Sequence, residues 1–307
     1  MPSTSRRTKR PQKRTQVTDD NGWTHVTSGG NVRRVMRSRP DSTNGTSTDP
    51  SFEPVLAPAE APGRLTITEL QTQYREHSEK WEGSETWVNL AGVLQKKLRE
   101  RGSERAFTSP GPTSSLSESS STSTSCRSEP AYGPVDAIVC IGLGSPSGFL
   151  RDGWTDRRSV SMYQLAALVS IKDMVTAQME ETSHSQIQPV KVYAQDPVFN
   201  HLDKTLLADL DIEVLAHPQA FTHITHNTLL FCPGAEKKHL ELLLPSKPWL
   251  VFGGPLEHAT ADAGGALQTF VDATGSYCLP EFGPLEHAFW NMRLYWVEGE
   301  TVEKQKE

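Results

Sequence analysis

The chain has 307 residues, and its 31 Lys and Arg against 37 Asp and Glu give a net charge of −6 at neutral pH. That length allows one or two domains at roughly 100 to 200 residues each, with a core that needs neither disulfides nor metal for stability. The acidic balance argues against a uniformly basic nucleic-acid binder. A hydrophobic content of 36% lies below the roughly 45–50% of globular domains, so we expect part of the chain to lack packed structure.

Residues 1–64 predict a disordered basic tail, because Pro, Ser, Thr, Arg and Gly offer too little apolar surface to offset the entropy of ordering. Residues 1–40 hold ten Lys and Arg against two Asp (+8), which leaves 21 basic and 35 acidic residues (−14) in the rest of the chain. A cluster near the start predicts a nuclear import signal or a weak nucleic-acid contact, with a solvated tail as the alternative. It consists of Arg6, Arg7, Lys9, Arg10, Lys13 and Arg14.

The four cysteines follow no spacing typical of a metal site or a disulfide framework, which favours a reducing compartment. No run approaches the roughly 18 apolar residues of a spanning helix, and the N-terminus lacks the apolar core of a signal peptide. We therefore expect a soluble intracellular protein that makes no membrane contact.

Residues 65–102 predict a pair of helices. Thr66 and Glu69 form a capping-box pattern at the start of the first helix, and Ser84 is the expected cap of the second, which should end near Gly102. Residues 103–134 predict a disordered linker open to phosphorylation, since 13 of the 18 residues in 108–125 are Ser or Thr.

Strand and helix patterns alternate from residue 135 to 297. Short apolar runs predict strands at 135–141, 190–194, 212–215, 228–232 and 249–252, and helical stripes lie between them at 160–179, 201–210 and 236–244. This alternation predicts an α/β fold with a Rossmann-like, mostly parallel sheet flanked by helices. If the strand order is the common 3-2-1-4-5, strands one and four are neighbours. Residues 288–297 predict a last edge strand, and residues 298–307 a charged tail.

The residues that follow these strands are the candidate ligand-binding site. Ligands of open parallel sheets bind beyond the carboxyl ends of the strands, where the strand order reverses. The fold should gather the loops after the strands on that edge. The candidates are Gly142, Gly144, Ser145, Ser147, Asp196, Gly234, Gly253 and Gly254.

Two of these features have a structural alternative that we favour. Gly142 and Gly144 could cradle a phosphate at a helix start, but Pro146 interrupts the loop and Ser147 stands where a third glycine is expected, so a tight turn is the preferred interpretation. Asp196 could hold a ligand hydroxyl or act as a base, yet Asp before Pro also starts turns and caps helices.

A haem ligand, a metal site and catalytic motifs were also sought in the sequence. Cys232 before Pro233 could give a thiolate to haem iron, although a buried thiol is the simpler interpretation. The spacing of His217, His223 and His226 matches no recognised metal site, so we predict none. No nucleophile elbow, Walker loop or paired carboxylates are found, so no catalytic residue is assigned and the cofactor stays unidentified.

The successive motifs resemble those of the SRR (Sensitivity to Red Light Reduced) domain family over about residues 135–297. They are VCIGLGS at 139–145, YQLA at 163–166, VY at 192–193, DPVF at 196–199 and TLLF at 228–231. The Gly-Trp-Thr island at 22–24, after a basic tail, is similar to the N-terminal region of fungal members. The resemblance implies a Rossmann-like module without established catalytic activity, located in the nucleus and cytoplasm. It also implies a link to light and circadian signalling, haem-linked regulation or microtubule-related processes.

The chain departs from the family pattern at the rim of the sheet. Residues 232–235 read CPGA where members usually carry Pro-His-Cys, residues 253–255 read GGP in place of Gly-Asn-Ser, and residues 290–291 read WN in place of Asn-Asp. Polar side chains are thereby missing where catalysis would need them. We expect a regulatory protein with protein partners that is non-catalytic or binds a nucleotide-like or haem ligand weakly. The alternative is a nucleotide- or S-adenosylmethionine-dependent enzyme that uses the Gly142–Gly144 loop.

Overall fold

The computed structural model describes residues 14–18, 24–28, 57–108, 133–149, 157–182, 189–257 and 265–297. The chain divides into two units, Met1–Pro54 and Val55–Glu307. In the first unit, β1 (Arg14–Thr18) pairs antiparallel with β2 (Thr24–Ser28), where the sequence predicts no regular structure. Both strands contain Thr and Val, whose branched side chains favour extended backbone. The rest of the predicted basic cluster, residues 6–13, lies outside the described residues, as do residues 109–132 of the predicted linker and the tail from 298.

The second unit is built on a seven-stranded sheet in the order β5-β4-β3-β6-β7-β9-β8. The first five strands in this order are parallel, and β9 runs antiparallel to both of its neighbours. The five parallel strands have the common order 3-2-1-4-5. The strands are β3 (Ala137–Ile141), β4 (Lys191–Gln195), β5 (Glu213–Val214), β6 (Thr228–Cys232), β7 (Leu250–Gly253), β8 (Thr274–Cys278) and β9 (Arg293–Val297).

The prediction of a last edge strand at residues 288–297 is wrong in its position. The strand exists as β9, but it lies between β7 and β8, and β8 forms the edge. Strand β8 was not predicted because its residues, TGSYC, contain no apolar run. An edge strand packs fewer side chains than a central one and can be built from such residues.

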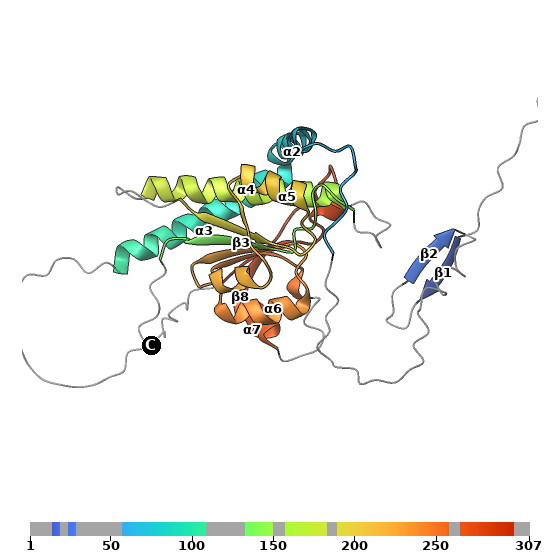
Figure 1. The fold of residues 1–307 in the computed structure, drawn as a ribbon. Coiled ribbons are helices and arrows are strands. Elements are labelled where there is room, and N and C mark those ends of the chain that lie inside the picture. The colour runs from blue at the N-terminus through green and yellow to red at the C-terminus, as the bar shows by residue number, and fades with distance from the viewer. Residues whose placement is uncertain are drawn as a thin grey trace, which may run out of the picture. The chain divides into compact units, whose positions relative to one another are not determined.

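Helices cover both faces of the sheet (Figure 1). One face carries α2 (Ile67–Glu82), α3 (Glu85–Thr108), α4 (Arg158–Thr182) and α5 (His201–Asp209). The other carries α6 (Lys237–Leu243), α7 (Ala266–Asp272) and the 3-10 turn η1 (Gln219–His223). Short 3-10 turns η2 (Leu244–Ser246) and η4 (Glu286–Ala288) complete the unit. None of the described helices is long and apolar enough to cross a membrane.

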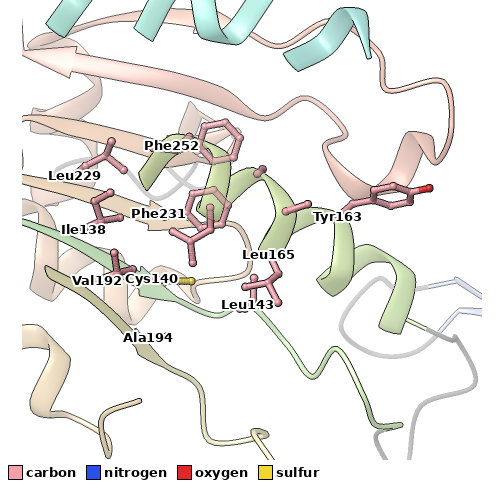
Figure 2. Packing of buried hydrophobic residues seen from close by; sticks show 14 of the residues in the cluster. Ile138, Cys140, Leu143, Tyr163, Leu165, Val192, Ala194, Leu229, Phe231 and Phe252 are labelled. Carbon is pink, nitrogen blue, oxygen red and sulfur yellow. The ribbon is translucent and has the colours of Figure 1, made fainter. Parts of the chain in front are cut away.

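The alternation of side chains along each strand explains the two cores. Ile138 and Cys140 of β3 point to the α4 face, where Figure 2 shows them among Leu165, Phe231 and Phe252. Val139, which lies between them in sequence, packs with α6 and α7 on the opposite face. Because both faces are covered, β3 and β6 are buried along their whole length.

The helical pair begins as the sequence predicts. Thr66 Oγ1 accepts a 3.2 Å hydrogen bond from the amide of Glu69, whose carboxylate accepts 2.9 Å from the amide of Thr66. Ser84 caps α3 through the amide of Trp87 at 3.1 Å. The helix does not end near Gly102 but continues to Thr108, since a single glycine costs a helix only about 1 kcal/mol.

Two cations fasten α3 to the amino edge of the sheet. The Arg101 side chain is buried, donates to the carbonyl of Gly133 at 2.8 Å and to Asn227 Oδ1 at 2.5 Å, and lies over the ring of Trp249. Lys97 lies 4.2 Å from the centre of the Trp296 ring. These contacts make the helical pair part of the α/β unit.

Candidate functional site

The predicted site residues meet at one edge of the sheet. Gly142, Asp196 and Gly234 follow the parallel strands β3, β4 and β6, and Gly253 ends the parallel strand β7. The carboxyl ends of parallel strands face the same way, so these loops share a rim, as expected. Their contacts determine what the rim can bind.

The strand order reverses between β3 and β6, and the two loops touch there. Gly142 has φ +77°, and a Cβ on it would lie 2.6 Å from the carbonyl carbon of Gly234. A Cβ on Gly234 would lie 2.5 Å from the carbonyl oxygen of Gly142. Glycine is therefore required at both positions for close backbone packing, and the loops leave no room for a side chain between them.

Asp196 joins the loops that follow β3 and β4. Its carboxylate accepts hydrogen bonds from the amide of Gly144 at 2.8 Å and from the amide of Val198 at 3.0 Å. Burial raises the pKa of this carboxyl group, and the two amide hydrogen bonds oppose that rise. The Asp196 carboxylate therefore joins two loops of the chain, and the Gly144 amide is already engaged.

Ser145 and Ser147 belong to a buried polar cluster centred on Asp203. Asp203 is fully buried and accepts from the Ser145 hydroxyl at 2.6 Å and from the amides of Ser147 and Asn200 at 2.9 and 3.0 Å. The Asn200 amide group donates to the Ser147 hydroxyl at 2.8 Å. The two serines, predicted to contact a ligand, therefore bond to other residues of the chain.

Asn200 and Asp203 also lie at this rim, but they were not among the residues predicted from the sequence. They form the capping box of α5, in which Asn200 Oδ1 accepts from the amides of Leu202 and Asp203. The sequence at 200–203 reads NHLD, an Asn-x-x-Asp pattern before an apolar run. That pattern was the available signal.

Residues 57–60 cross this cluster as an extended segment. Ala59 donates to the carbonyl of Val198 at 2.8 Å, and Glu60 exchanges two 2.9 Å backbone hydrogen bonds with Phe149. Ala59 also covers Gly148, where a Cβ would lie 2.8 Å from its own. The predicted boundary of the tail at residue 64 is therefore too late, since Ala59 and Glu60 already bond to the α/β unit.

A cavity of about 320 Å³ opens at the same edge of the sheet, between the ends of β6 and β7 and the start of α6. Two of the predicted residues, Gly254 and Cys232, border it, but most of its wall was not predicted. It is lined by Cys232, Pro233, Ala235, Lys237, Leu240, Gly254, Pro255 and Leu256.

The turn after β7 that borders this cavity is held by one tyrosine. The Tyr295 hydroxyl accepts from the amide of Leu256 at 2.9 Å and donates to Glu257 Oε2 at 2.7 Å. Gly254 has φ +90°, and a Cβ on it would lie 2.6 Å from the amide nitrogen of Leu256. Arg293 lies 3.6 Å from the Glu257 carboxylate.

The Cys232 thiol is unsuited to the haem role that the sequence raised. Its side chain is 3% exposed, and burial raises the pKa of the thiol to about 12. The thiolate, which is the form that ligates metal, is therefore scarce at neutral pH. The favoured interpretation of a buried thiol at a strand end fits this environment.

The histidines after β5 make packing contacts. His217 Nδ1 lies 3.0 Å from the side-chain amide nitrogen of Gln195, and His223 stacks on Tyr193 at 4.1 Å between ring centres. Gln195 is buried and its oxygen accepts from the amide of Ala220 at 2.9 Å. In the part of the chain that the structure describes, no group of three or more His, Cys, Asp and Glu could hold a metal ion.

One hydroxyl and one carboxylate meet at the rim, at Ser145 and Asp203. Both side chains are buried, and Ala59 and Glu60 hydrogen-bond to the neighbouring loops at Val198 and Phe149. The cavity between β6 and β7 is lined by one basic side chain and no acidic one.

A family model described as the SRR1 domain matches residues 94–296. The match begins inside α3 and ends in β9, so it includes the end of the helical pair as well as the sheet. No curated protein and no solved structure matches the chain.

Proposed function

The chain belongs to the SRR1 domain family, and we propose that it is a regulatory protein whose domain acts by binding, to a protein partner or weakly to a small ligand, without catalysis. The observation that supports this proposal is the mutual satisfaction of the polar groups at the rim. Gly144 donates to Asp196, and Ser145 donates to Asp203. A catalytic rim needs donors and acceptors directed at a substrate.

The competing function is a nucleotide- or S-adenosylmethionine-dependent enzyme. Such an enzyme would present the amides of the Gly142–Gly144 loop to a phosphate or carboxylate group. The amide of Gly144 has Asp196 as its acceptor, and the amide of Gly142 donates to the carbonyl of Gln195 at 3.4 Å. A ligand would have to displace both, which disfavours this alternative.

Thermal unfolding of the full chain distinguishes the two functions. We expect ATP, NAD, S-adenosylmethionine and haem, each added in excess, to shift the melting temperature by less than about one degree, because a ligand that does not bind the native state does not stabilise it. NMR spectra of the same mixtures should show the small molecules chemically unchanged after hours.

A shift of several degrees with ATP, NAD or S-adenosylmethionine would support the enzyme, provided that Asp196→Asn abolishes the shift. Asp173→Asn serves as the matched control, because the Asp173 side chain is exposed on α4. Turnover of any compound by the wild type, absent from Asp196→Asn, would overturn the proposal outright.

A further inference from the structure

We propose that the edge strand β8 pairs with the same strand of a second copy of the chain, antiparallel and about a two-fold axis at Ser276. In this dimer two seven-stranded sheets join into one continuous sheet. The interface lies along the side of the sheet, and it goes beyond the binding function proposed above.

The two edge strands of the sheet differ in how they are protected. Edge strands in proteins are usually short, charged or interrupted by Pro, which blocks pairing with another chain. Strand β5 has only two residues, and the charged Asp211 and Glu213 are exposed there. Strand β8 has five residues, TGSYC, with no charge and no Pro. In the part of the chain that the structure describes, no strand pairs with the outer side of β8.

The register with β9 determines which backbone groups of β8 point outward. The amide of Leu279 donates to the carbonyl of Met292 at 2.9 Å, and these two residues are opposite each other, directly after the last pair of the ladder. Hydrogen-bonded and non-hydrogen-bonded pairs alternate along antiparallel strands. The N–H and C=O groups of Thr274, Ser276 and Cys278 therefore point away from β9. They form a row of donors and acceptors with which another strand can pair.

The sequence of β8 is complementary to itself in this arrangement. When Ser276 lies opposite Ser276 of the second copy, Thr274 lies opposite Cys278, and these pairs exchange the outward backbone hydrogen bonds. Gly275 then lies opposite Tyr277 in a non-hydrogen-bonded pair, where side chains are closest. An aromatic ring opposite an edge glycine covers the strand surface that the glycine leaves bare.

The absence of charge on β8 favours a second copy over a charged peptide as the partner. A second copy brings the same side chains, so self-pairing requires a strand on which no like charges meet. Residues 273–279 carry no charge, and the flanking Asp272 and Glu281 lie beyond the paired positions. Arg293 of the neighbouring strand lies 3.6 Å from the Glu257 carboxylate. An uncharged edge also offers no electrostatic attraction to an acidic or basic peptide.

The first test is sedimentation of the full chain over a range of concentrations. We expect a single-chain mass of 34.0 kDa below about 1 μM and twice that mass above about 100 μM, since an interface built on two short strands is small.

Two substitutions at Ser276 provide a matched pair of variants. Ser276→Pro removes an outward N–H, which edge strands tolerate, and should raise the dissociation constant of the dimer at least about tenfold. Ser276→Ala also loses the 2.9 Å hydrogen bond from Arg293 but keeps the N–H, so it should change the constant less than about twofold. Circular dichroism of dilute samples confirms that both variants are folded.

Cysteine cross-linking tests the register. In a chain with Cys126→Ser and Cys278→Ser, the two remaining cysteines are buried. Ser276→Cys in this background should give a disulfide-linked dimer on oxidation, because the Cα atoms of a hydrogen-bonded pair are about 5.5 Å apart. Thr274→Cys in the same background should not, because the two copies of this residue lie four positions apart. With Cys278 restored, Thr274→Cys should cross-link.

A single-chain mass up to about 500 μM, equal weakening by Ser276→Pro and Ser276→Ala, or cross-linking of Thr274→Cys without Cys278 would each overturn the inference. If Ser276→Pro does not fold, the cross-links alone decide. None of these outcomes bears on the function proposed for the rim, which the ligand and turnover measurements test separately.

Discussion

The Asp196 carboxylate accepts a 2.8 Å hydrogen bond from the amide of Gly144, 52 residues earlier in the chain. It accepts a second from Val198, two residues later, at 3.0 Å. One side chain thus fixes the loop that follows β3 and the turn that follows β4. The same pair would be the phosphate-binding amide and the ribose-binding acid of a nucleotide site, and here they bind each other.

Replacing Asp196 by alanine should destabilise the fold by about 2 kcal/mol. Two amides, of Gly144 and Val198, would lose their acceptor at a cost of roughly 1–3 kcal/mol each, partly offset because a buried carboxylate is removed. Urea denaturation measures the change. Asp173→Ala, at an exposed position on α4, should stay within about 0.5 kcal/mol of wild type, and a similarly small effect at Asp196 would contradict this role.

Asp203→Ala should cost more, about 3 kcal/mol or above, since it leaves three donors without an acceptor in a buried site. Ser145→Ala should be less damaging in the Asp203→Ala background than in wild type, with a coupling energy of about 0.5–3 kcal/mol. The four unfolding free energies of this double-mutant cycle provide the check. Additive effects would show that Ser145 and Asp203 do not interact as described.

Gly142→Ala should destabilise the protein by more than about 2 kcal/mol. The substitution forces a side chain into left-handed backbone, at φ +77°, and brings its Cβ within 2.6 Å of Gly234. Gly283→Ala provides the comparison, because nothing lies within 4 Å of a Cβ at that position. Equal melting temperatures for the two variants would mean that the loops after β3 and β6 do not touch.

The Cys232 thiol should resist alkylation by iodoacetamide at pH 8–9 in the native protein, while exposed Cys278 reacts. Burial raises the pKa of the Cys232 thiol to about 12, against 9.0 for a free thiol. The protonated thiol therefore stabilises the folded state below pH 9. This contribution to the free energy of unfolding is lost as the pH rises toward 12. Mass spectrometry of the two peptides measures the labelling. Rapid labelling of Cys232 before unfolding would show that the strand end is open.

The sequence was sufficient to predict the parallel strands at the centre of the sheet and insufficient to predict the strands at its edge. Apolar runs such as 228–232 identify a strand because a central strand, covered on both faces, must be apolar throughout. Residues 274–278 have no such pattern, so β8 was missed, and with it the interior position of β9. The capping boxes at Thr66 and Asn200 are local patterns, and only the first was recognised.

The contacts that close the rim could not be predicted from local pattern. Ala59 reaches Val198 through backbone atoms, and Asp203 reaches Ser145 across 58 residues. Neither contact corresponds to a motif or a residue spacing that could be recognised in the sequence. The prediction placed the right loops on one edge but could not show that their polar groups satisfy one another, nor that Lys237 and Leu256 line a cavity.

Amide-resolved hydrogen exchange of the full chain tests the central claim most directly. If the rim is closed by its own contacts, the amides of Gly144, Ser147 and Val198 should exchange slowly in the free protein, and ATP, NAD or S-adenosylmethionine should not change their rates. Fast exchange of these amides in the free protein, with protection appearing only when a nucleotide is added, would contradict the account.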